Sequence, residues 1–400
     1  MKNIFQYITG DKGIWGVIML LSVFSFLPVY SASSNLAYLY GDGSTLPYLL
    51  KHLAHLMLGF GILYGVHKIP YHYFRGLSLL GLPVIVILLI ITISEGTTIS
   101  GANASRWLRI PFVGITFQTS ILAGVVLMTY VAFYLAKTKD KALRFKETIL
   151  PLWLPVFLVL GLILPANFST AAIFFVLTVM LVFIGGYPLR YIGIVLGAGL
   201  LFLTLFVLTA KAVPGLFPNR VDTWISRVEN FTDKSDAEAN YQIEKAKIAI
   251  ASGGITGVGP GKSKQKNFLP QSTSDFIYAI IVEEFGLLGG LLVMFLYLFL
   301  LFRIVVIAHK ATSVFGKLLA IGVGTPIVFM ALINMAVAVE LFPVTGQNLP
   351  LLSSGGTSIW MTCLALGMVL SVSVKREKLV QESKSEETEE NPLEILSKTI

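Results

Sequence analysis

The sequence predicts an all-α protein that crosses a membrane about ten times, with its helices packed in lipid. Hydrophobic residues make up 55% of the 400 residues and charged residues only 13%, whereas a soluble domain usually carries about 25% charged residues. The mean hydropathy is +0.78. Several apolar runs reach the roughly 20 residues that one helix needs to cross a bilayer. These observations exclude an ordinary water-soluble domain.

Ten apolar segments follow one another along the chain. The first starts near Ile14, lacks a cleavable signal pattern and is long enough to stay in the membrane. The fifth and sixth are separated only by the three residues 165–167. The predicted spans are residues 14–32, 48–66, 77–93, 117–136, 149–165, 170–185, 191–212, 276–302, 318–338 and 357–374.

The distribution of Lys and Arg predicts the orientation. Alternate loops are rich in these residues, whereas the other short loops hold only Lys51, Arg106 and Arg109. Because positive residues stay in the cytoplasm, we expect both termini inside and the long loop, residues 213–275, outside. The net charge of +8 then reflects orientation and not nucleic-acid binding. The single cysteine, Cys363, allows no disulfide within the chain.

The chain divides into a transmembrane domain, residues 1–374, and a tail, residues 375–400. The tail is acidic and has no apolar period, so we expect it to be disordered and cytoplasmic. Within the long loop, an apolar stripe at residues 224–231 predicts one amphipathic helix. A second helix is expected at residues 238–251, with Gly253 and Gly254 as its stop. These helices either lie on the membrane surface or pack on the bundle.

The glycine-rich segment 257–263 and the lysines in and after it are candidates for phosphate binding. The segment fails the P-loop pattern, because Thr256 stands where the first Gly is required. It is either a plain turn or a turn that presents N–H groups to a diphosphate. Lys262, Lys264 and Lys266 form either a solvated face against lipid headgroups or a cradle for that diphosphate.

Acidic residues at the start of the eighth span are the other candidates. Asp275 follows a polar stretch and directly precedes an apolar run, which places it at the membrane–water boundary. It is either the N-cap of the helix or a functional carboxylate. Glu283 and Glu284 come about two turns later, roughly 12 Å deeper at 1.5 Å per residue. At that depth a carboxylate requires a polar cavity or a partner.

Several motifs resemble the SEDS family (shape, elongation, division and sporulation; FtsW, RodA and SpoVE). The segment 269–286, from Leu269-Pro-Gln to Glu284-Phe-Gly, is similar to the family's stretch around its catalytic Asp. The resemblance spans residues 14–374 in the family's order. The other matching motifs lie at residues 101–107, 117–118, 241–242, 252–259, 343–346, 349–350 and 353–358.

The resemblance implies a membrane-embedded peptidoglycan glycosyltransferase that polymerises lipid II on the outer face of the bacterial cytoplasmic membrane. It implies that Asp275 is the general base. It also implies that Ser353, Ser354, Gly355 and Gly356 bind substrate. Cations must then neutralise the diphosphate leaving group, for which we expect Arg106, Lys262, Lys264 and Lys266, or a divalent ion such as Mg or Mn. No protein-bound metal site is predicted.

The expected partners are lipid II, membrane lipid, a class B penicillin-binding protein acting as transpeptidase, and other divisome proteins. The segment 351–360 is closer to the division branch than to the elongation branch, and both roles stay open. Two functions from other classes also stay open, a lipid II flippase and a non-catalytic scaffold. A transporter is expected to keep polar residues near mid-membrane.

Three departures from the family pattern concern charged positions. Ile121 and Gly124 stand where the fourth helix of the family usually has Glu and Lys. Loss of both members leaves no unpaired buried charge. Asn167 and Gln271 each replace an acid, so the family's roles for these acids do not carry over to this chain.

Overall fold

The computed structural model describes residues 9–40, 43–96, 107–109, 116–212, 237–269 and 272–389, and it is almost entirely helical. The long helices are α1 (Lys12–Tyr40), α2 (Leu46–Lys68), α3 (Phe74–Glu95), α4 (Thr119–Thr138), α6 (Leu154–Ile163), α7 (Phe168–Ile184), α8 (Leu189–Ala212), α10 (Ala237–Gly253), α11 (Ile277–Lys310), α12 (Val314–Ala338) and α13 (Gly356–Glu389). Shorter elements are η2 (Tyr71–Tyr73), α5 (Phe145–Thr148), the π-helical turn η3 (Ile149–Trp153) and η4 (Gln265–Asn267).

Each of the ten predicted apolar segments coincides with a helix. Within the described residues, eight helices are long and apolar enough to cross a membrane, and residues 168–184 and 189–205 form two shorter apolar helices. The fifth segment, residues 149–165, starts as η3, which contains Pro151, and continues as α6, and the short helix α5 lies directly before it. Asn167 ends the break between α6 and α7, because its side chain accepts a hydrogen bond from the Thr170 amide.

Two short strands modify the predicted all-α fold. β1 (Trp107–Arg109) and β2 (Thr116–Gln118) pair antiparallel, with Leu108 opposite Phe117. The predicted fourth span began at residue 117, but the helix α4 starts only at Thr119. The ladder uses the backbone groups of residues 116–118 before the chain enters the bundle, where the helix must satisfy its own backbone.

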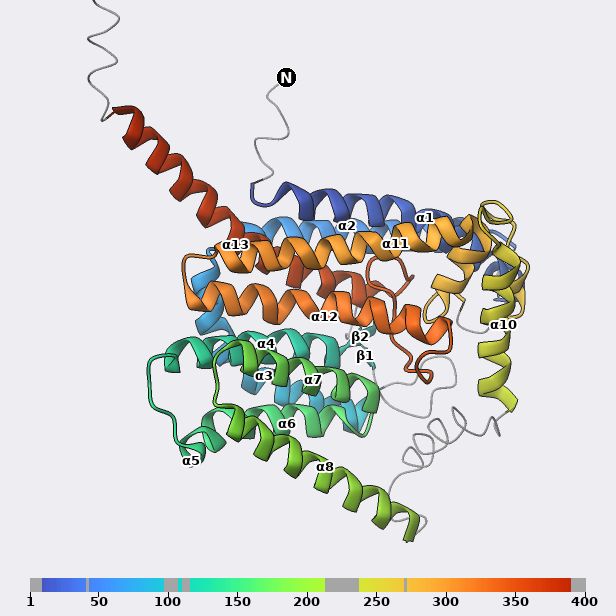
Figure 1. Ribbon diagram of the computed structural model, residues 1–400. Helices are drawn as coiled ribbons and strands as arrows, with labels where there is room; N and C mark the ends of the chain where they lie inside the picture. The colour runs from blue at the N-terminus through green and yellow to red at the C-terminus, as the bar shows by residue number, and fades with distance from the viewer. Residues whose placement is uncertain are drawn as a thin grey trace, which may run out of the picture.

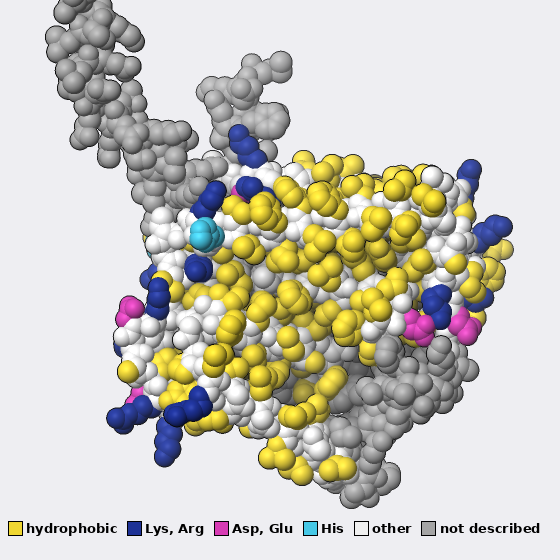
Figure 2. Space-filling model, viewed as in Figure 1, with side chains coloured by type: hydrophobic (Ala, Val, Ile, Leu, Met, Phe, Trp, Pro, Cys, Tyr) yellow, Lys and Arg dark blue, Asp and Glu magenta, His cyan; other side chains and the backbone are white. Residues whose placement is uncertain are grey.

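The helices form one bundle with α12 near its centre. α13 lies along α2, α11 along α12, and α3 along α4. In the most apolar 18-residue stretches of α12 and α13, 83% of the residues are buried, against 22% in those of α2 and α3. Exposed Leu, Ile, Val and Phe side chains cover the middle of the bundle, and charged side chains gather toward its two ends (Figure 2). This apolar belt is the surface expected of a multi-pass membrane protein.

The start of α1 and the end of α13 lie at one end of the bundle, while α10 and the strands lie at the opposite end (Figure 1). This arrangement agrees with the predicted orientation. α13 continues to Glu389, so helical backbone covers the first part of the predicted tail. The disorder and the cytoplasmic location of that tail stay predictions, and residues 390–400 lie outside the described residues.

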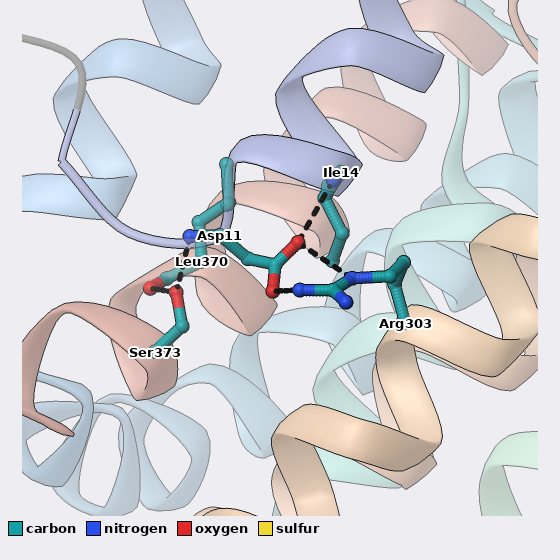
Figure 3. A network of polar contacts seen from close by, with 5 residues as sticks. All are labelled: Asp11, Ile14, Arg303, Leu370 and Ser373. Carbon is teal, nitrogen blue, oxygen red and sulfur yellow. Dashed lines mark hydrogen bonds and ion pairs between the residues drawn. The ribbon is translucent and has the colours of Figure 1, made fainter. Parts of the chain in front are cut away.

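A polar network ties three helices together at the end where the chain begins (Figure 3). The Arg303 guanidinium on α11 donates from Nε to Asp11 Oδ1 at 3.0 Å and from Nη2 to Asp11 Oδ2. The same carboxylate accepts the Ile14 amide and caps α1. The Asp11 amide in turn donates to Ser373 Oγ on α13 at 3.0 Å. The bidentate ion pair joins the first span to the eighth. The hydrogen bond to Ser373 joins the first span to the last.

Helix α10 packs on the bundle, which is one of the two arrangements predicted for it. Ala246 and Ala249 are fully buried in a cluster with Phe276 and Ala279. α10 ends at Gly253, and Gly254 has a φ of +54°, which agrees with the predicted stop. The other amphipathic stretch, residues 224–231, lies outside the described residues.

Candidate active site

Asp275 lies in a turn, residues 272–276, at the start of α11. Its side chain is half-buried. The helix begins at Ile277 and its N-cap position is Phe276, so Asp275 stands one residue before the position that capping requires. Phe276 itself is 1% exposed and anchors the turn to α10. The structure thus places the carboxylate at the end of the bundle that is predicted to face outward.

The segment predicted to bind substrate, residues 353–356, lies directly against this turn. Ser353 Oγ donates to the Ser274 carbonyl at 2.8 Å, and Ser354 donates to the Thr273 carbonyl from both its amide, at 3.0 Å, and its hydroxyl, at 3.1 Å. Substrate binding by these serines stays a prediction. What the structure adds is that both hydroxyls contact the backbone of the Asp275 turn.

Gly355 and Gly356 allow close packing at the start of α13. A Cβ atom at Gly356 would lie 2.5 Å from the His55 ring, and one at Gly355 would lie 2.6 Å from Asn348 Nδ2. The two glycines therefore bring α2 and the 348 loop close to the Asp275 turn. Substrate binding by these glycines also stays a prediction.

The three predicted lysines do not form one uniform stripe. Lys262 and Lys264 are exposed, whereas Lys266 is half-buried. Lys266 Nζ donates to the Gly261 carbonyl at 2.8 Å and to Ser31 Oγ at 3.2 Å. Two of the three lysines are thus exposed to solvent, and the third is hydrogen-bonded within the protein. Arg106, the fourth predicted cation, lies outside the described residues.

The glycine-rich segment docks into a break in α11. Gly286 has φ +70° and ψ −172°, which interrupts the helix. The amides of Val258 and Gly259 donate to the carbonyls of Glu283 and Glu284, both at 3.0 Å. On the other side of the break, the amides of Leu287 and Leu288 donate to the carbonyls of Gly254 and Ile255. Since a helix break leaves backbone groups unpaired, this pairing satisfies them.

The docked segment is neither of the alternatives predicted for it. It is not a plain turn, and its Val258 and Gly259 amides point to protein carbonyls and not to a ligand. Gly257 and Gly286 are needed because the backbones of the docked segment and of α11 approach each other closely. A Cβ atom at Gly257 would lie 2.2 Å from the Glu284 carbonyl oxygen, and one at Gly286 would lie 2.2 Å from the Ile255 carbonyl oxygen.

Glu283 and Glu284 have polar partners, as their predicted depth requires. They are 2% and 1% exposed. Glu283 accepts from the amides of Lys264 and Gln265 and from the Ser263 hydroxyl. Glu284 accepts from the Ser31 hydroxyl and the Ser263 amide. The two carboxylates thereby fix the loop 257–268 against the bundle, next to the Asp275 turn.

The position of the missing charged pair is apolar. An apolar cavity between α4, α7, α12 and α13 is lined by Ile121, Gly124 and Phe174 among others. The Phe174 ring packs directly on Gly124, since a Cβ atom added there would lie 1.9 Å from the ring. Packing of Phe174 against bare backbone therefore occupies part of the space near this position of α4.

Two further residues were not predicted from the sequence: Asn334, which contacts the turn, and Gln347, which binds Asn334. Asn334 Nδ2 donates to the carbonyls of both Asp275 and Gln347 at 2.7 Å, and Gln347 Nε2 donates to Thr170 Oγ1 at 2.9 Å. A signal for Asn334 was present, because it is a lone amide within the apolar span 318–338 and a polar group at that depth requires a partner.

The described residues contain no group of three or more His, Cys, Asp or Glu that could hold a metal ion, and a divalent ion for the diphosphate stays a prediction.

Comparison with known proteins identifies relatives of the chain. A family profile described as "Cell cycle protein" and covering FtsW, RodA and SpoVE matches residues 11–378. A protein named "Probable peptidoglycan glycosyltransferase FtsW" from Geobacter sulfurreducens is 32% identical over 379 residues, covering 94% of this chain and 97% of that protein. A protein of the same name from Hydrogenovibrio crunogenus is 34% identical over 394 residues, covering 94% and 95%.

Solved structures share the fold. One is a chain from work on the structural coordination of polymerization and crosslinking by a peptidoglycan synthase complex, with a TM-score of 0.70 and 25% identity over 92% of this chain and 98% of that one. Another is the rod shape determining protein RodA of Thermus thermophilus, with a TM-score of 0.65 and 24% identity over 93% and 99%. The profile match and the relatives above 30% identity show that this chain belongs to the FtsW/RodA/SpoVE family of cell cycle proteins, the SEDS family.

Proposed function

We propose that this chain is a peptidoglycan glycosyltransferase that polymerises lipid II on the outer face of the bacterial cytoplasmic membrane. The observation that carries the proposal is the placement of Asp275. Its carboxylate is half-buried at one end of an apolar bundle, in a turn held by hydrogen bonds from α12 and from the loop before α13. A sugar whose lipid tail stays in the bilayer can reach that level.

The chemistry requires few protein groups. The 4-hydroxyl of an acceptor GlcNAc attacks C1 of a donor MurNAc, and Asp275 takes the hydroxyl proton. The new C1–O bond forms as the bond from C1 to the diphosphate oxygen breaks, and undecaprenyl diphosphate leaves with the electron pair. Diphosphate is a good leaving group, so protonation of the leaving oxygen is not needed. One carboxylate and a source of positive charge therefore suffice.

The positive charge comes from the outer surface near the turn. Lys262 and Lys264 are exposed and follow the glycine segment that docks beside Glu283 and Glu284. We assign the diphosphate to these two lysines, with Arg106 or a divalent ion such as Mg or Mn as further sources of charge. Lys266, which binds Ser31 and Gly261, supports the loop and is the weaker candidate for diphosphate contact.

The biological role that we propose is septal wall synthesis in cell division. The relatives that match over most of the chain are named FtsW. An elongation role is the alternative. A polymerase that makes glycan strands needs a transpeptidase to crosslink them, and the similar chain of known structure was studied in a peptidoglycan synthase complex that coordinates the two reactions. We therefore propose a class B penicillin-binding protein as partner, with other divisome proteins and membrane lipid around it.

Polymerisation of lipid II by the purified chain tests the proposal. The chain is copurified in detergent with its cognate transpeptidase, and the products from lipid II are separated on a gel. We expect glycan strands from the complex. A chain that copurifies and stays folded but makes no strands would contradict the enzyme assignment. Transfer of labelled lipid II across vesicle membranes by that same chain would favour a flippase, and neither activity would favour a scaffold.

A further inference from the structure

We propose that Asn334, Ser353 and Ser354 are positioning residues that fix the turn carrying Asp275. The proposal rests on the catalytic role proposed above for that carboxylate. It differs from the role that the family resemblance implies for the serines, which is contact with the substrate. It also adds Asn334, to which the sequence analysis gave no role.

The geometry that carries this proposal is the binding of three consecutive carbonyls by three side chains from outside the turn. Ser354 donates to the carbonyl of Thr273, Ser353 to that of Ser274, and Asn334 to that of Asp275. The donors are separated from their acceptors by 81, 79 and 59 residues. Ordinary turns satisfy such carbonyls locally or with water. Here every carbonyl from 273 to 275 is bound by α12 or by the loop before α13.

The Asn334 side chain has only one orientation that satisfies its neighbours. Two carbonyl oxygens, those of Asp275 and Gln347, lie 2.7 Å from the same side-chain atom, which must therefore be the NH2 group. Asn334 is 1% exposed, so no water competes for these bonds. In a dry environment such hydrogen bonds are strong and resist rearrangement. The amide thus joins the end of α12, the 347 loop and the Asp275 turn.

The Ser353 hydroxyl donates its hydrogen within the protein, so this hydrogen is not available for a bond to the diphosphate of a substrate. It donates its one proton to Ser274 and accepts the Leu349 amide at 2.8 Å. A hydroxyl has a single donor, and a diphosphate oxygen can only accept. With 2% exposure, Ser353 could reach a diphosphate only by releasing the turn. Its contacts therefore favour positioning over substrate binding.

Restraint of the turn matters because a general base must meet its proton at a defined distance. Misplacement by about 1 Å can cost on the order of 100-fold in rate. A turn held only by the covalent chain would let Asp275 sample many positions. Binding its carbonyls from two other segments removes this freedom before the substrate arrives. The expected signature is a loss in kcat, with little change in KM.

The test uses the full chain with its transpeptidase partner and three substitutions, Ser353→Ala, Ser354→Ala and Asn334→Leu. We measure kcat and KM for lipid II, and hydrogen–deuterium exchange in peptides that cover residues 272–276. We expect kcat to fall by about tenfold or more with KM within about twofold of the wild-type value. Exchange in the turn should rise in each variant. Ser353→Thr, which keeps the hydroxyl, should recover kcat.

Thr325→Val is the matched control, since Thr325 is a buried residue of α12 whose hydroxyl, within the described part of the chain, bonds to the Ile321 carbonyl of its own helix. It should leave both kcat and exchange in the turn unchanged. If Asn334→Leu unfolds the chain, the two serine variants still test the proposal, and Ser353→Ala should have the larger effect because the Ser354 amide keeps its own bond to the Thr273 carbonyl. A rise in KM at constant kcat would make the serines substrate ligands and overturn the proposal. Unchanged kinetics, or lost activity with normal exchange, would overturn it too.

Failure of the proposed function gives a different result. If the wild-type complex makes no glycan strands, the enzyme assignment fails, while the exchange data still report whether these side chains hold the turn. If the wild type is active and the variants keep its kcat, only the positioning role fails.

Discussion

At the residue scale, the proposed mechanism depends on the carboxylate of one residue, Asp275, which is half-buried and whose carbonyl is hydrogen-bonded. Asp275 supplies its carbonyl to Asn334, and the helix cap falls on Phe276. A substitution at this position can therefore change the carboxylate without removing a helix cap. Asn is the sharpest such change, because it preserves size and shape and cannot take up a proton at neutral pH.

We expect Asp275→Asn to lower lipid II polymerisation by about 100-fold or more, which is the typical contribution of a general base. The melting temperature should stay close to that of the wild type, and copurification with the transpeptidase should persist. Asp275→Glu should also be slow, since the extra methylene moves the carboxylate by about an ångström. Gel analysis of the glycan products beside a melting curve makes both comparisons. Near-normal strands from the Asn variant would remove Asp275 from the mechanism.

Gly124 shows how one residue adapts the bundle to the loss of a charged pair. Its missing side chain admits the Phe174 ring, which is 2% exposed. Restoring only a lysine at 124 would bring both a clash with this ring and an unpaired charge in the bilayer. Adding Ile121→Glu to Gly124→Lys would pair the buried charge but would not remove the clash of the lysine with the Phe174 ring. Full rescue therefore also requires a smaller residue at position 174.

Gly124→Ala isolates the steric effect without any charge. We expect it to lower the free energy of unfolding by about 1–3 kcal/mol, the usual cost of overpacking. The double variant Gly124→Ala with Phe174→Leu should recover part of the loss. Gly161→Ala is the control, because no atom of the residues that the structure describes lies within 4 Å of that Cβ and Ala favours the helix. Equal melting temperatures for Gly124→Ala and Gly161→Ala would contradict the packing argument.

At the scale of elements, the break in α11 and the segment that fills it form one unit. Gly286 interrupts the helix, and residues 254–259 satisfy the backbone groups that the interruption exposes. The Glu283 and Glu284 side chains then bind the loop that follows this segment. The unit places the exposed Lys262 and Lys264 in the loop that binds α11, the helix that directly follows the Asp275 turn. A disturbance of the break should therefore reach the candidate site.

Two glycines of this loop provide a matched comparison. Gly257 and Gly261 both have positive φ, +82° and +76°, so Ala at either position costs backbone strain of about 1–2 kcal/mol. At Gly257 the new Cβ would meet the backbone of α11, whereas at Gly261 no atom of the described residues lies within 4 Å of it. We expect Gly257→Ala to melt clearly lower and to lose activity, and Gly261→Ala to show the smaller strain effect alone. Equal melting would show that the segment does not need to dock closely.

At the scale of the whole molecule, the two ends of the bundle carry different polar groups. One end carries the network of Asp11 and Arg303 and the start of α1, and the other carries α10 and the Asp275 turn (Figures 1 and 3). The predicted orientation places the Asp275 end outside, which is the side on which we propose that lipid II is polymerised. The buried native thiol, Cys363, is 1% exposed and provides a low background for thiol labelling.

Cysteines introduced at two exposed positions test this orientation. Ser252 lies on α10, and Asp140 lies in the loop after α4. An impermeant thiol reagent applied to right-side-out vesicles should label Ser252→Cys and should leave Asp140→Cys unlabelled until the vesicles are opened. Labelling of Asp140→Cys in sealed vesicles would reverse the predicted topology.

The sequence by itself determined the ten apolar segments, the stop of α10 at Gly253 and the candidacy of Asp275. It could do so because bilayer thickness sets the length of a span, and because each helix satisfies its own backbone within lipid. The packing of one helix on another leaves no comparable signal. Lipid and helix interior are both apolar, so no polar stripe marks which face of a span is buried.

Only the tertiary structure decided which distant residues meet at the site. It brought Asn334 and Ser353 onto the Asp275 turn, and it docked the glycine segment into the break at Gly286. Neither contact has a local pattern, since each joins backbone groups left unpaired in one segment to donors far away in the chain. Such pairing depends on where the helices end relative to one another, and the packing of the complete bundle sets those positions.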